Sequence, residues 1–356
     1  MDMQQVLIEN MNLMIKKVTY EKPNGWQFKN RNYKKVIDIL KSSDIPSLIK
    51  LNNTKKVTEF YTKLFKENGY KNPTKIMGKV IELYEKYFNN KNIDETEMIL
   101  DEAKEFQSLP AFKAVDIFSK IYGVGPAKIK TLINNGIYNL EQLRYALIKD
   151  IKLLNNKQKL GLKHYNDLNE RIPRSEISKF RKKVETIITT KFNNEISMVI
   201  TGSYRRGLKT SGDIDMLICS EKYKDYALSM LLKELKQNGM IKETLAKGMK
   251  KFMGLIKVEK EGKIRHLDII ETTPTDYPFA MLYFTGSAVF NVQMRKHLLT
   301  MGYSLNEYDM TIKGSKTRVP PEKIKEKIGK NNFETEEDIF NFIGIPYREP
   351  EKRIKL

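Results

Sequence analysis

Residues 202–215 read GSYRRGLKTSGDID, and the fold of the C-terminal half of the chain can be predicted from this segment outward. It follows the apolar run Glu195–Ile200, which is typical of a strand, and the pair Gly202-Ser203 predicts a turn into a helix. Asp213 and Asp215 stand two residues apart on the next predicted strand, so their carboxylates point to the same face. The pattern therefore predicts two carboxylates beside helix amides that can hold phosphate oxygens.

A third carboxylate completes this pattern. Asp268 stands among apolar residues in the predicted strand Leu267-Asp268-Ile269-Ile270, where an unpaired charge is costly to bury. Neighbouring carboxylates repel one another unless a cation lies between them, and their hard oxygen atoms suit Mg²⁺. Three carboxylates and two Mg²⁺ ions can activate an attacking hydroxyl and stabilise a leaving pyrophosphate. A D-x-D pair alone is common at solvated strand ends, and the combination with Gly-Ser and the third Asp indicates nucleotidyl transfer.

The region around this motif is predicted to be mixed α/β, and the region before it helical. Strands are expected at 195–200, 213–218, 251–256 and 264–270, and helices at 222–238, 287–301 and 335–344. From residue 31 to about 170, apolar residues recur at three- and four-residue steps. The predicted class is therefore α+β, with four domains at 1–96, 97–173, 174–274 and 275–356.

Charge and composition restrict the partners. The 356 residues carry 64 Lys and Arg against 44 Asp and Glu, a net charge of +20. Such an excess favours a polyanion such as nucleic acid, although it can also serve solubility alone. One cysteine excludes a disulfide framework and a thiolate zinc cluster. The sequence has no apolar run of about 18–20 residues and no secretory signal, so we expect an intracellular, soluble protein.

A second motif is Gly123-Val124-Gly125-Pro126, which lies between two apolar helical patterns. Two helices joined by this turn form a helix-hairpin-helix, whose amides grip a phosphate without reading the base sequence. An ordinary tight turn between core helices is the alternative. Pro126, Lys128 and Lys130 at the start of the second helix favour binding of the DNA backbone.

A third motif is Tyr283-Phe284-Thr285-Gly286-Ser287. A close aromatic pair before glycine can press on a sugar and exclude a 2′-hydroxyl. Without other context, the segment is typical of a buried strand that ends in a turn, and we expect that structure from the residues alone.

Taken in order, these motifs resemble the family X DNA polymerases. The resemblance rests on GSYRRG…SGDID, KKFMGLI, HLDII, YFTGSAVFN and YREP, and it is nearly continuous from about Ala114 to Arg353. Residues 1–113 match more loosely. There, KNRNYKK at 29–35 and TKIMGK at 74–79 are similar to the family's 8-kDa lyase domain.

The resemblance implies roles for individual residues of the polymerase part. Asp213 and Asp215 bind both Mg²⁺ ions (Mn²⁺ can substitute), and Asp268 binds one of them and accepts the proton of the primer 3′-hydroxyl. The implied contacts to the nucleotide come from Arg171, Ser203, Arg206, Gly212, Tyr283, Phe284, Gly286 and Asn291. Arg295 is expected at the template strand. The hairpin glycines Gly123 and Gly125 contact DNA, and a Na⁺ or K⁺ ion is held by the carbonyls of Ser119, Ile121 and Val124.

In the N-terminal part the resemblance implies 5′-deoxyribose phosphate lyase activity with Lys79 as nucleophile. Lys75 and Lys79 are four residues apart, on one helix face. Clustered ammonium groups lower one another's pKa, which frees an amine to form a Schiff base. Lys29, Tyr33 and Lys75 are expected to hold the 5′-phosphate. A solvated basic face is the alternative.

Three positions depart from the family pattern. His266 stands where the family has arginine, beside Arg265, and Ala288 stands where it has aspartate. The first hairpin is replaced by Tyr70-Lys71-Asn72-Pro73, which puts a cation site there in doubt.

The expected function is template-directed gap filling in DNA repair of the base-excision type. The expected partners are gapped or nicked DNA and dNTPs, with a DNA ligase or an AP endonuclease nearby and no membrane. We expect a monomer in the nucleus or cytoplasm, and a viral origin is compatible with the composition. Two alternatives stay open, a template-independent terminal transferase and a non-catalytic DNA-end scaffold. Poly(A) polymerases, CCA-adding enzymes and small-molecule nucleotidyltransferases share G-S…D-x-D but lack the other motifs.

Overall fold

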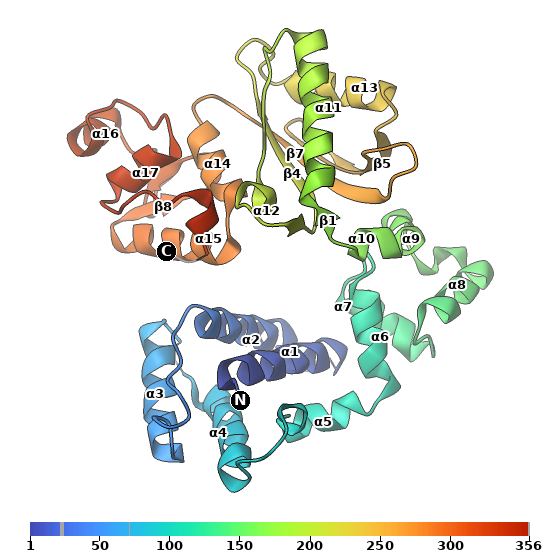
Figure 1. Ribbon diagram of the computed structural model, residues 1–356, viewed down its shortest axis with the longest axis vertical. Helices are drawn as coiled ribbons and strands as arrows, with labels where there is room; N and C mark the ends of the chain where they lie inside the picture. The colour runs from blue at the N-terminus through green and yellow to red at the C-terminus, as the bar shows by residue number, and fades with distance from the viewer. Residues whose placement is uncertain (22–24, 71, 355–356) are drawn as a thin grey trace. The chain divides into compact units, whose positions relative to one another are not determined.

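The computed structural model describes residues 1–21, 25–70 and 72–354. The chain divides into two compact units, Met1–Lys163 and His164–Leu356, and each is described by itself. The predicted class, α+β, is confirmed: the first unit is helical and the second contains the sheets (Figure 1). The finer division into four domains stays a prediction. Within the described residues, every helix is too short or too polar to span a lipid bilayer.

The first unit consists of helices joined by short connections. In chain order they are α1 (Met3–Glu21), α2 (Trp26–Lys41), α3 (Thr54–Glu67), α4 (Thr74–Asn89), η1 (Glu95–Glu97), α5 (Asp101–Gln107), α6 (Pro110–Ser119), α7 (Pro126–Asn134), α8 (Leu140–Lys149), η2 (Ile151–Leu153) and α9 (Asn156–Lys163). Helix α1 packs against α2 and also against α5, α6 and α7. The N-terminal helices and the hairpin helices therefore share one compact unit.

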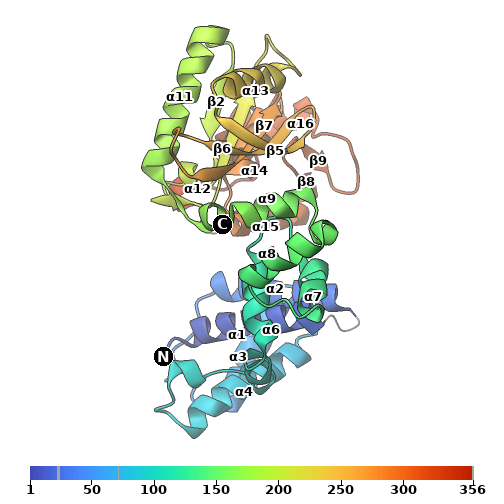
Figure 2. The ribbon, with the colours of Figure 1, turned by 90° about the vertical axis from the view of Figure 1, so that its right-hand side faces the viewer.

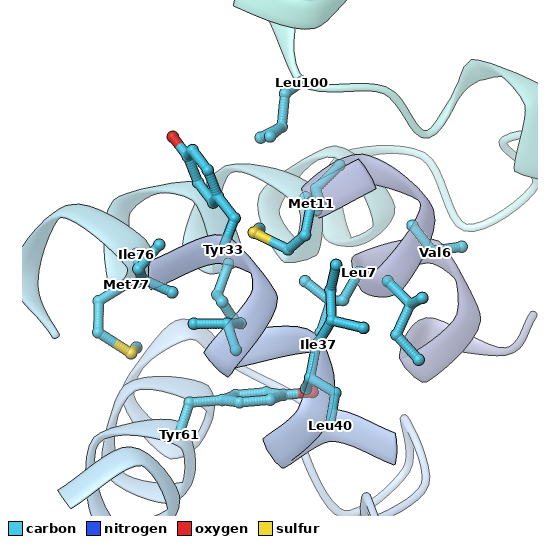
Figure 3. Close-up of a cluster of buried hydrophobic side chains, with 14 of the residues drawn as sticks. Val6, Leu7, Met11, Tyr33, Ile37, Leu40, Tyr61, Ile76, Met77 and Leu100 are labelled. Carbon is cyan, nitrogen blue, oxygen red and sulfur yellow. The ribbon is translucent and has the colours of Figure 1, made fainter. Parts of the chain in front are cut away.

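The apolar faces of the N-terminal helices meet in one core. Ile37 and Leu40 are buried there, as the three- and four-residue spacing predicts, together with Leu7 and Met11 of α1. Figure 3 shows Tyr33 with its ring beside this cluster and its hydroxyl pointing away from Ile37 and Leu40. The Tyr33 ring therefore packs with the core, while its hydroxyl points away from the core.

The second unit contains a five-stranded sheet with helices and two small two-stranded sheets. Its elements are α10 (Tyr165–Asn169), β1 (Ile172–Pro173), α11 (Arg174–Phe192), β2 (Ser197–Ile200), α12 (Gly202–Arg205), β3 (Thr210–Ser211), β4 (Ile214–Cys219), α13 (Ala227–Gln237), β5 (Ile241–Lys247), β6 (Lys251–Lys257), β7 (Ile264–Thr272), α14 (Tyr277–Thr285), α15 (Ala288–Thr300), β8 (Tyr303–Leu305), β9 (Met310–Ile312), α16 (Pro321–Ile328), α17 (Glu336–Phe342) and η3 (Pro350–Lys352). The large sheet has the order β2-β4-β7-β6-β5.

The two faces of this sheet are covered differently. Met216, Ile218 and Ile269 pack into the core formed with α11 and α13, which lie along the sheet in Figures 1 and 2. Leu217 and Ile270, one residue out of phase, pack with α14 instead. Because side chains alternate along a strand, residues in phase with Leu217 and Ile270 face the α14 side.

The predicted strands are confirmed, with their ends shifted by at most two residues. The sequence reading missed β5, an edge strand whose Lys242 and Glu243 hide the alternation expected of a half-buried strand. The prediction of a strand at Tyr283–Phe284 was wrong, because these residues close helix α14. Pro278, Phe279, Ala280, Met281 and Leu282 are all buried, and a short helix covered on all sides has the same apolar run as a buried strand.

Candidate active site

The site is built on the parallel pair β4 and β7. Asp215 and Asp268 are register partners on these neighbouring strands. Both are in phase with the residues that pack against α14, so both carboxylates face that side of the sheet. Asp213 immediately precedes β4 and lines the same cleft as Asp215. The fold thus brings together the three predicted carboxylates, which are separated by up to 55 positions in the sequence.

Their proximity has an electrostatic cost. Burial, followed by repulsion from Asp213 and Asp268, raises the pKa of Asp215 from 3.8 to about 7, although Arg206 and Lys251 act in the opposite direction. Burial also raises the pKa of Asp268, and His266 and Lys251 lower it. A protein without a cation here therefore disfavours full ionisation of the cluster.

The donor set fits a divalent cation. Within the described residues, no three carboxylate, imidazole or thiolate groups converge closely enough to hold an ion as they stand. However, Oδ1 of Asp268 is buried and accepts no hydrogen bond from the described residues, and the Nδ1 atom of His266 lies 3.4 Å from it. A buried oxygen without a donor, next to two further carboxylates, is the environment that a hard cation stabilises.

A cleft of about 590 Å³ is lined by Asp213 and Asp215, and Asp268 is the register partner of Asp215 outside this lining. It brings together every residue that the sequence assigned to the nucleotide: Arg171, Ser203, Arg206, Gly212, Tyr283, Phe284, Gly286 and Asn291. Arg295 lines the same cleft. Residues from four separate segments therefore converge on one concave surface.

Hydrogen bonds fix the polar wall of this cleft. The hydroxyl of Ser203 donates to that of Ser211 over 2.8 Å. Arg206 donates from Nη1 to the carbonyl of Thr285 over 2.6 Å. Arg171 donates from Nε to the Thr210 hydroxyl and from Nη2 to the Thr210 carbonyl, over 3.1 and 2.6 Å. These bonds hold two guanidinium groups and a hydroxyl in the lining of the cleft, and guanidinium groups are well suited to pair with a polyanion.

Another part of the lining is aromatic. The rings of Tyr283 and Phe284 meet edge to face, with centroids 5.0 Å apart. The guanidinium of Arg295 lies 4.8 Å from the centroid of Tyr283, and the amide of Asn291 donates to the Tyr283 carbonyl over 2.7 Å. Gly286, at φ 68°, ends α14 where a side chain would be strained.

Sequence reasoning missed two apolar residues of the cleft, Leu208 and Val292. Val292 is 60 % exposed and stands four residues after Ala288 on α15, so the two share a helix face. This spacing on the predicted helix 287–301 was a usable signal. Ala288 and Val292 therefore form an exposed apolar pair in a polar cleft, which suits contact with the flat face of a nucleobase.

Arg265 does not replace the arginine that the family carries at His266. Arg265 is 2 % exposed and pairs with Glu176 of α11, with both nitrogen–oxygen distances at 2.8 Å. It shares the sheet face of Leu267, whereas His266 shares that of Asp268. The single-residue offset therefore puts Arg265 on the side away from the carboxylates.

A buried ionic cluster connects the cleft to the C-terminal elements. Glu336, at the start of α17, accepts two hydrogen bonds from the guanidinium of Arg205 of α12, over 3.0 and 2.6 Å. It also accepts a hydrogen bond from Arg353. Arg205 donates in addition to the hydroxyl of Thr285, at the end of α14. Since Ser203 and Arg205 belong to the same short helix, the cluster fixes that helix relative to the aromatic wall.

The predicted helix-hairpin-helix is present in the first unit. Helix α6 ends at Ser119 and α7 begins at Pro126, with Gly123 at φ 78° between them. The Nε2 atom of Gln158 donates to the Gly123 carbonyl over 2.8 Å, and the Ile121 carbonyl accepts from the Val124 amide over 3.0 Å. Of the three residues whose carbonyls are assigned to a monovalent cation, Ile121 and Val124 therefore lie in this turn and Ser119 is the last residue of α6.

A second cavity, of about 410 Å³, lies in the first unit. It brings together the four residues that the sequence assigned to the lyase site, Lys29, Tyr33, Lys75 and Lys79, and adds Lys17 of α1. We call it the N-terminal pocket. Burial raises the pKa of Tyr33 to about 12, with a further contribution from Tyr70.

Lys79 stands in a mixed electrostatic environment. Burial lowers its pKa, Lys17 and Lys29 lower it further, and Glu82 raises it. Glu102 contacts the ammonium of Lys79. In the altered first hairpin, Lys71 lies outside the described residues. The Asn72 side chain there accepts from the Thr74 hydroxyl over 2.8 Å at the start of α4.

Comparison with known families places these features in context. Residues 171–274 match the family model described as DNA polymerase beta palm, and residues 280–354 match DNA polymerase beta thumb. Residues 116–169 match the fingers domain of DNA polymerase lambda. The three matches together extend over more than half of the chain.

Individual relatives agree with these matches. DNA polymerase lambda of Rattus norvegicus is 33% identical over 250 residues, which make up 67% of this chain and 42% of the relative. DNA polymerase lambda of Arabidopsis thaliana is 28% identical over 271 residues, 71% and 49% of the two chains. DNA nucleotidylexotransferase of Xenopus laevis is 27% identical over 302 residues, 72% and 56%. The chain spans about half the length of these relatives.

Proposed function

Because the chain belongs to the family X DNA polymerases, we propose that it is a template-directed DNA polymerase that fills short gaps during repair. The observation that carries this proposal is the register pairing of Asp215 with Asp268, beside a cleft rich in phosphate-binding groups. Its substrates are dNTPs and gapped or nicked DNA. It acts in the compartment that holds the DNA, upstream of a ligase and downstream of an AP endonuclease.

Each wall of the cleft has a task in this reaction. Ser203, Arg206 and Arg171, with the backbone at Gly212, hold the triphosphate, since guanidinium groups pair with phosphate through charge-assisted bonds. Tyr283, Phe284 and Gly286 form the sugar wall and leave no room for a 2′-hydroxyl. Asn291 contacts the sugar or base edge, and Arg295 reaches the template strand.

Members of this family use divalent metal ions, and we assign Mg²⁺ to Asp213, Asp215 and Asp268. When bound, it supplies charge neutralisation for the triphosphate and the carboxylates. Asp268 accepts the proton of the primer 3′-hydroxyl at Oδ1, the buried oxygen to which the described residues donate no hydrogen bond. The neighbouring His266 orients this carboxylate.

The first unit binds the DNA backbone. Gly123 and Gly125 open the turn before α7, and its amides face a phosphate together with a Na⁺ or K⁺ ion held by the carbonyls of Ser119, Ile121 and Val124. In the N-terminal pocket, the neutral amine of Lys79 attacks the aldehyde carbon of a 5′-deoxyribose phosphate, and the aldehyde oxygen leaves as water when the Schiff base forms. Lys29, Tyr33 and Lys75 hold the phosphate.

Template-independent transfer is the second candidate, favoured by the similarity to the Xenopus nucleotidylexotransferase. That activity needs a segment that occupies the position of the template. The cleft is bordered by helices, strands and the short connections 170–171, 206–209, 212–213 and 286–287, and β5 joins β6 through residues 248–250. These short connections favour the templated reaction. A non-catalytic scaffold is disfavoured because all three carboxylates are retained.

Primer extension on a one-nucleotide gap with a 5′-phosphate, with and without the template strand, tests the proposal. We expect templated incorporation that depends on Mg²⁺ and falls by several orders of magnitude in Asp268→Ala. Extension without a template would favour the transferase. Near-wild-type extension by Asp268→Ala would refute the assignment of the carboxylates.

A further inference from the structure

Tyr283 and Phe284 separate two cavities. The pair lines the cleft of about 590 Å³ and also a second, partly open cavity of about 200 Å³. We call this second cavity the rear pocket; its other walls include Ile270 of β7, Ala280 of α14, Lys251 of β6 and Glu307. No role for the rear pocket follows from the reaction described above.

Its walls combine flat apolar surface with two available charges. Ile270, Ala280 and the two rings supply the apolar surface. Three other charged residues of its lining are already engaged: Lys250 with Asp225 at 3.0 Å, Asp276 with Arg318 at 2.9 Å, and Glu271 with the Leu228 amide at 2.9 Å. In contrast, the Lys251 and Glu307 side chains form no ion pair or hydrogen bond within the described part of the chain, although the Lys251 ammonium lies near enough to Asp215 and Asp268 to lower the pKa of both carboxyls.

Size restricts the ligand further. Pockets for drug-sized molecules measure about 300–1,000 Å³, so 200 Å³ accommodates one ring system and excludes a nucleotide. A ring held between aromatic and aliphatic walls gains stacking energy, and an ammonium and a carboxylate can each bond one polar edge. Nucleobases have this combination of a flat face with donor and acceptor edges.

We propose that the rear pocket binds a single nucleobase-sized heterocycle, which stacks against Tyr283 and Phe284 and bonds Lys251 and Glu307. Occupancy restrains the aromatic pair from behind and thereby weakens binding of the incoming nucleotide. The binding itself is independent of the catalytic assignment, whereas its effect on nucleotide binding rests on the proposed function. The heterocycle can come from a free base or from an unpaired base of the bound strand.

Fluorescence of 2-aminopurine tests binding in two arms with the full-length chain. In the first arm the free base is titrated with protein, and in the second the base stands unpaired in the template of a gapped duplex. Stacking on the rings is expected to quench the emission. Quenching in the first arm assigns the site to free bases, and quenching in the second assigns it to bases in DNA. Absence of quenching in both arms overturns the proposal.

Two variants locate the signal. Ala280→Leu fills the rear pocket and is expected to abolish quenching, and Glu307→Ala removes one polar edge and weakens binding about tenfold. Glu322→Ala, an exposed carboxylate on α16, is the matched control and retains wild-type binding. Because Ala280 is buried, circular dichroism confirms folding, and Glu307→Ala gives an independent result if Ala280→Leu is unfolded. Unchanged quenching in Glu307→Ala and in folded Ala280→Leu overturns the proposal.

Steady-state kinetics distinguish the rear pocket from the nucleotide cleft. A ligand in a separate site raises the KM for dNTP to a plateau, whereas a ligand in the cleft raises it without limit. We expect a plateau in the wild type and no effect in Ala280→Leu. A linear, unlimited rise would place the heterocycle in the nucleotide cleft and refute the rear pocket. If the chain extends no primer at all, the proposed polymerase function fails while the binding arms still decide the ligand site.

Discussion

Asp215 and Asp268 are register partners on the neighbouring parallel strands β4 and β7, with both carboxylates on the face covered by α14. Their separation is therefore set by strand spacing, about 4.8 Å between neighbouring strands, rather than by flexible loops. Burial raises the pKa of Asp215 to about 7, and the repulsion between the like charges that the sheet holds together adds to this shift. A bound cation would neutralise these carboxylates and remove the destabilisation, which is the basis of the first prediction.

Asp215→Asn is expected to stabilise the metal-free protein and to remove its response to Mg²⁺. The raised pKa means that the ionised side chain destabilises the fold, so a neutral isostere adds about 1–3 kcal/mol at pH 8. Thermal unfolding with and without Mg²⁺ measures both effects. We expect the wild type to gain stability from Mg²⁺ and Glu261→Gln, an exposed control in the same unit, to behave like the wild type. An undiminished Mg²⁺ response in Asp215→Asn would exclude that carboxylate as a ligand.

Gly202→Ala is expected to reduce primer extension at least tenfold. Gly202 has φ 56°, and an added Cβ would collide with the carboxylate of Asp215, so the side chain has to move. Gly248→Ala, in the connection between β5 and β6, meets only a carbonyl at 3.8 Å and serves as the control. Comparable kcat values for the two variants would show that the packing of Gly202 against Asp215 is irrelevant to the chemistry.

Neighbouring charges are expected to shift the pH profile of Schiff-base formation by Lys79. Lys17 lowers the pKa of Lys79 and Glu82 raises it. Lys17→Met therefore raises the pKa of Lys79, so covalent trapping of the Schiff base begins to increase at a higher pH. Glu82→Gln lowers that pKa, so the increase occurs at a lower pH. Lys29 and Glu102 also face the amine and stay unchanged in both variants.

Borohydride trapping on a pre-incised abasic site, followed across pH, measures these profiles. Shifts in the same direction for both variants would contradict the electrostatic account. Trapping that persists undiminished in Lys79→Ala would show that another amine is the nucleophile.

Glu336→Gln is expected to destabilise the second unit by about 3–5 kcal/mol, because it leaves two arginines with an uncompensated buried charge. Glu336 is 6 % exposed and pairs with Arg205 and with Arg353, which is 0 % exposed. Its neighbour Glu337 is exposed, so Glu337→Gln should change stability by less than about 0.5 kcal/mol. Urea unfolding of both variants gives the difference; equal midpoints would refute the role of the cluster.

DNA affinity is expected to depend on phosphates and not on base sequence. With a net charge of +20 and a hairpin that presents backbone amides, log K should fall linearly with log salt, with a slope of about 0.9 per neutralised phosphate. Fluorescence anisotropy with several unrelated gapped duplexes measures both properties. A flat salt response, or a strong preference for one duplex, would contradict this expectation.

Much of this protein is determined by local sequence. The alternation around Asp213 and Asp215, the glycines at 123 and 125 and the ordered motifs sufficed for the α+β class and for the family, because each depends on neighbours within a few residues. The spacing of Lys75 and Lys79 likewise indicated a shared helix face, since one turn of helix sets it. These signals need no knowledge of distant contacts.

Tertiary structure alone decided the rest. The segment that carries Tyr283 and Phe284 forms a helix although its apolar run is equally typical of a buried strand, because burial against β4 and α17 removes the polar face that would distinguish the two. Arg265 is turned away from the carboxylates because Glu176, 89 positions earlier in the sequence, pairs with it on the other face of the sheet. The pairing of Asp215 with Asp268, the N-terminal pocket and the rear pocket all depend on which surfaces pack together. That packing is a property of the whole chain, because apolar area can be buried only against partners that lie far away in sequence.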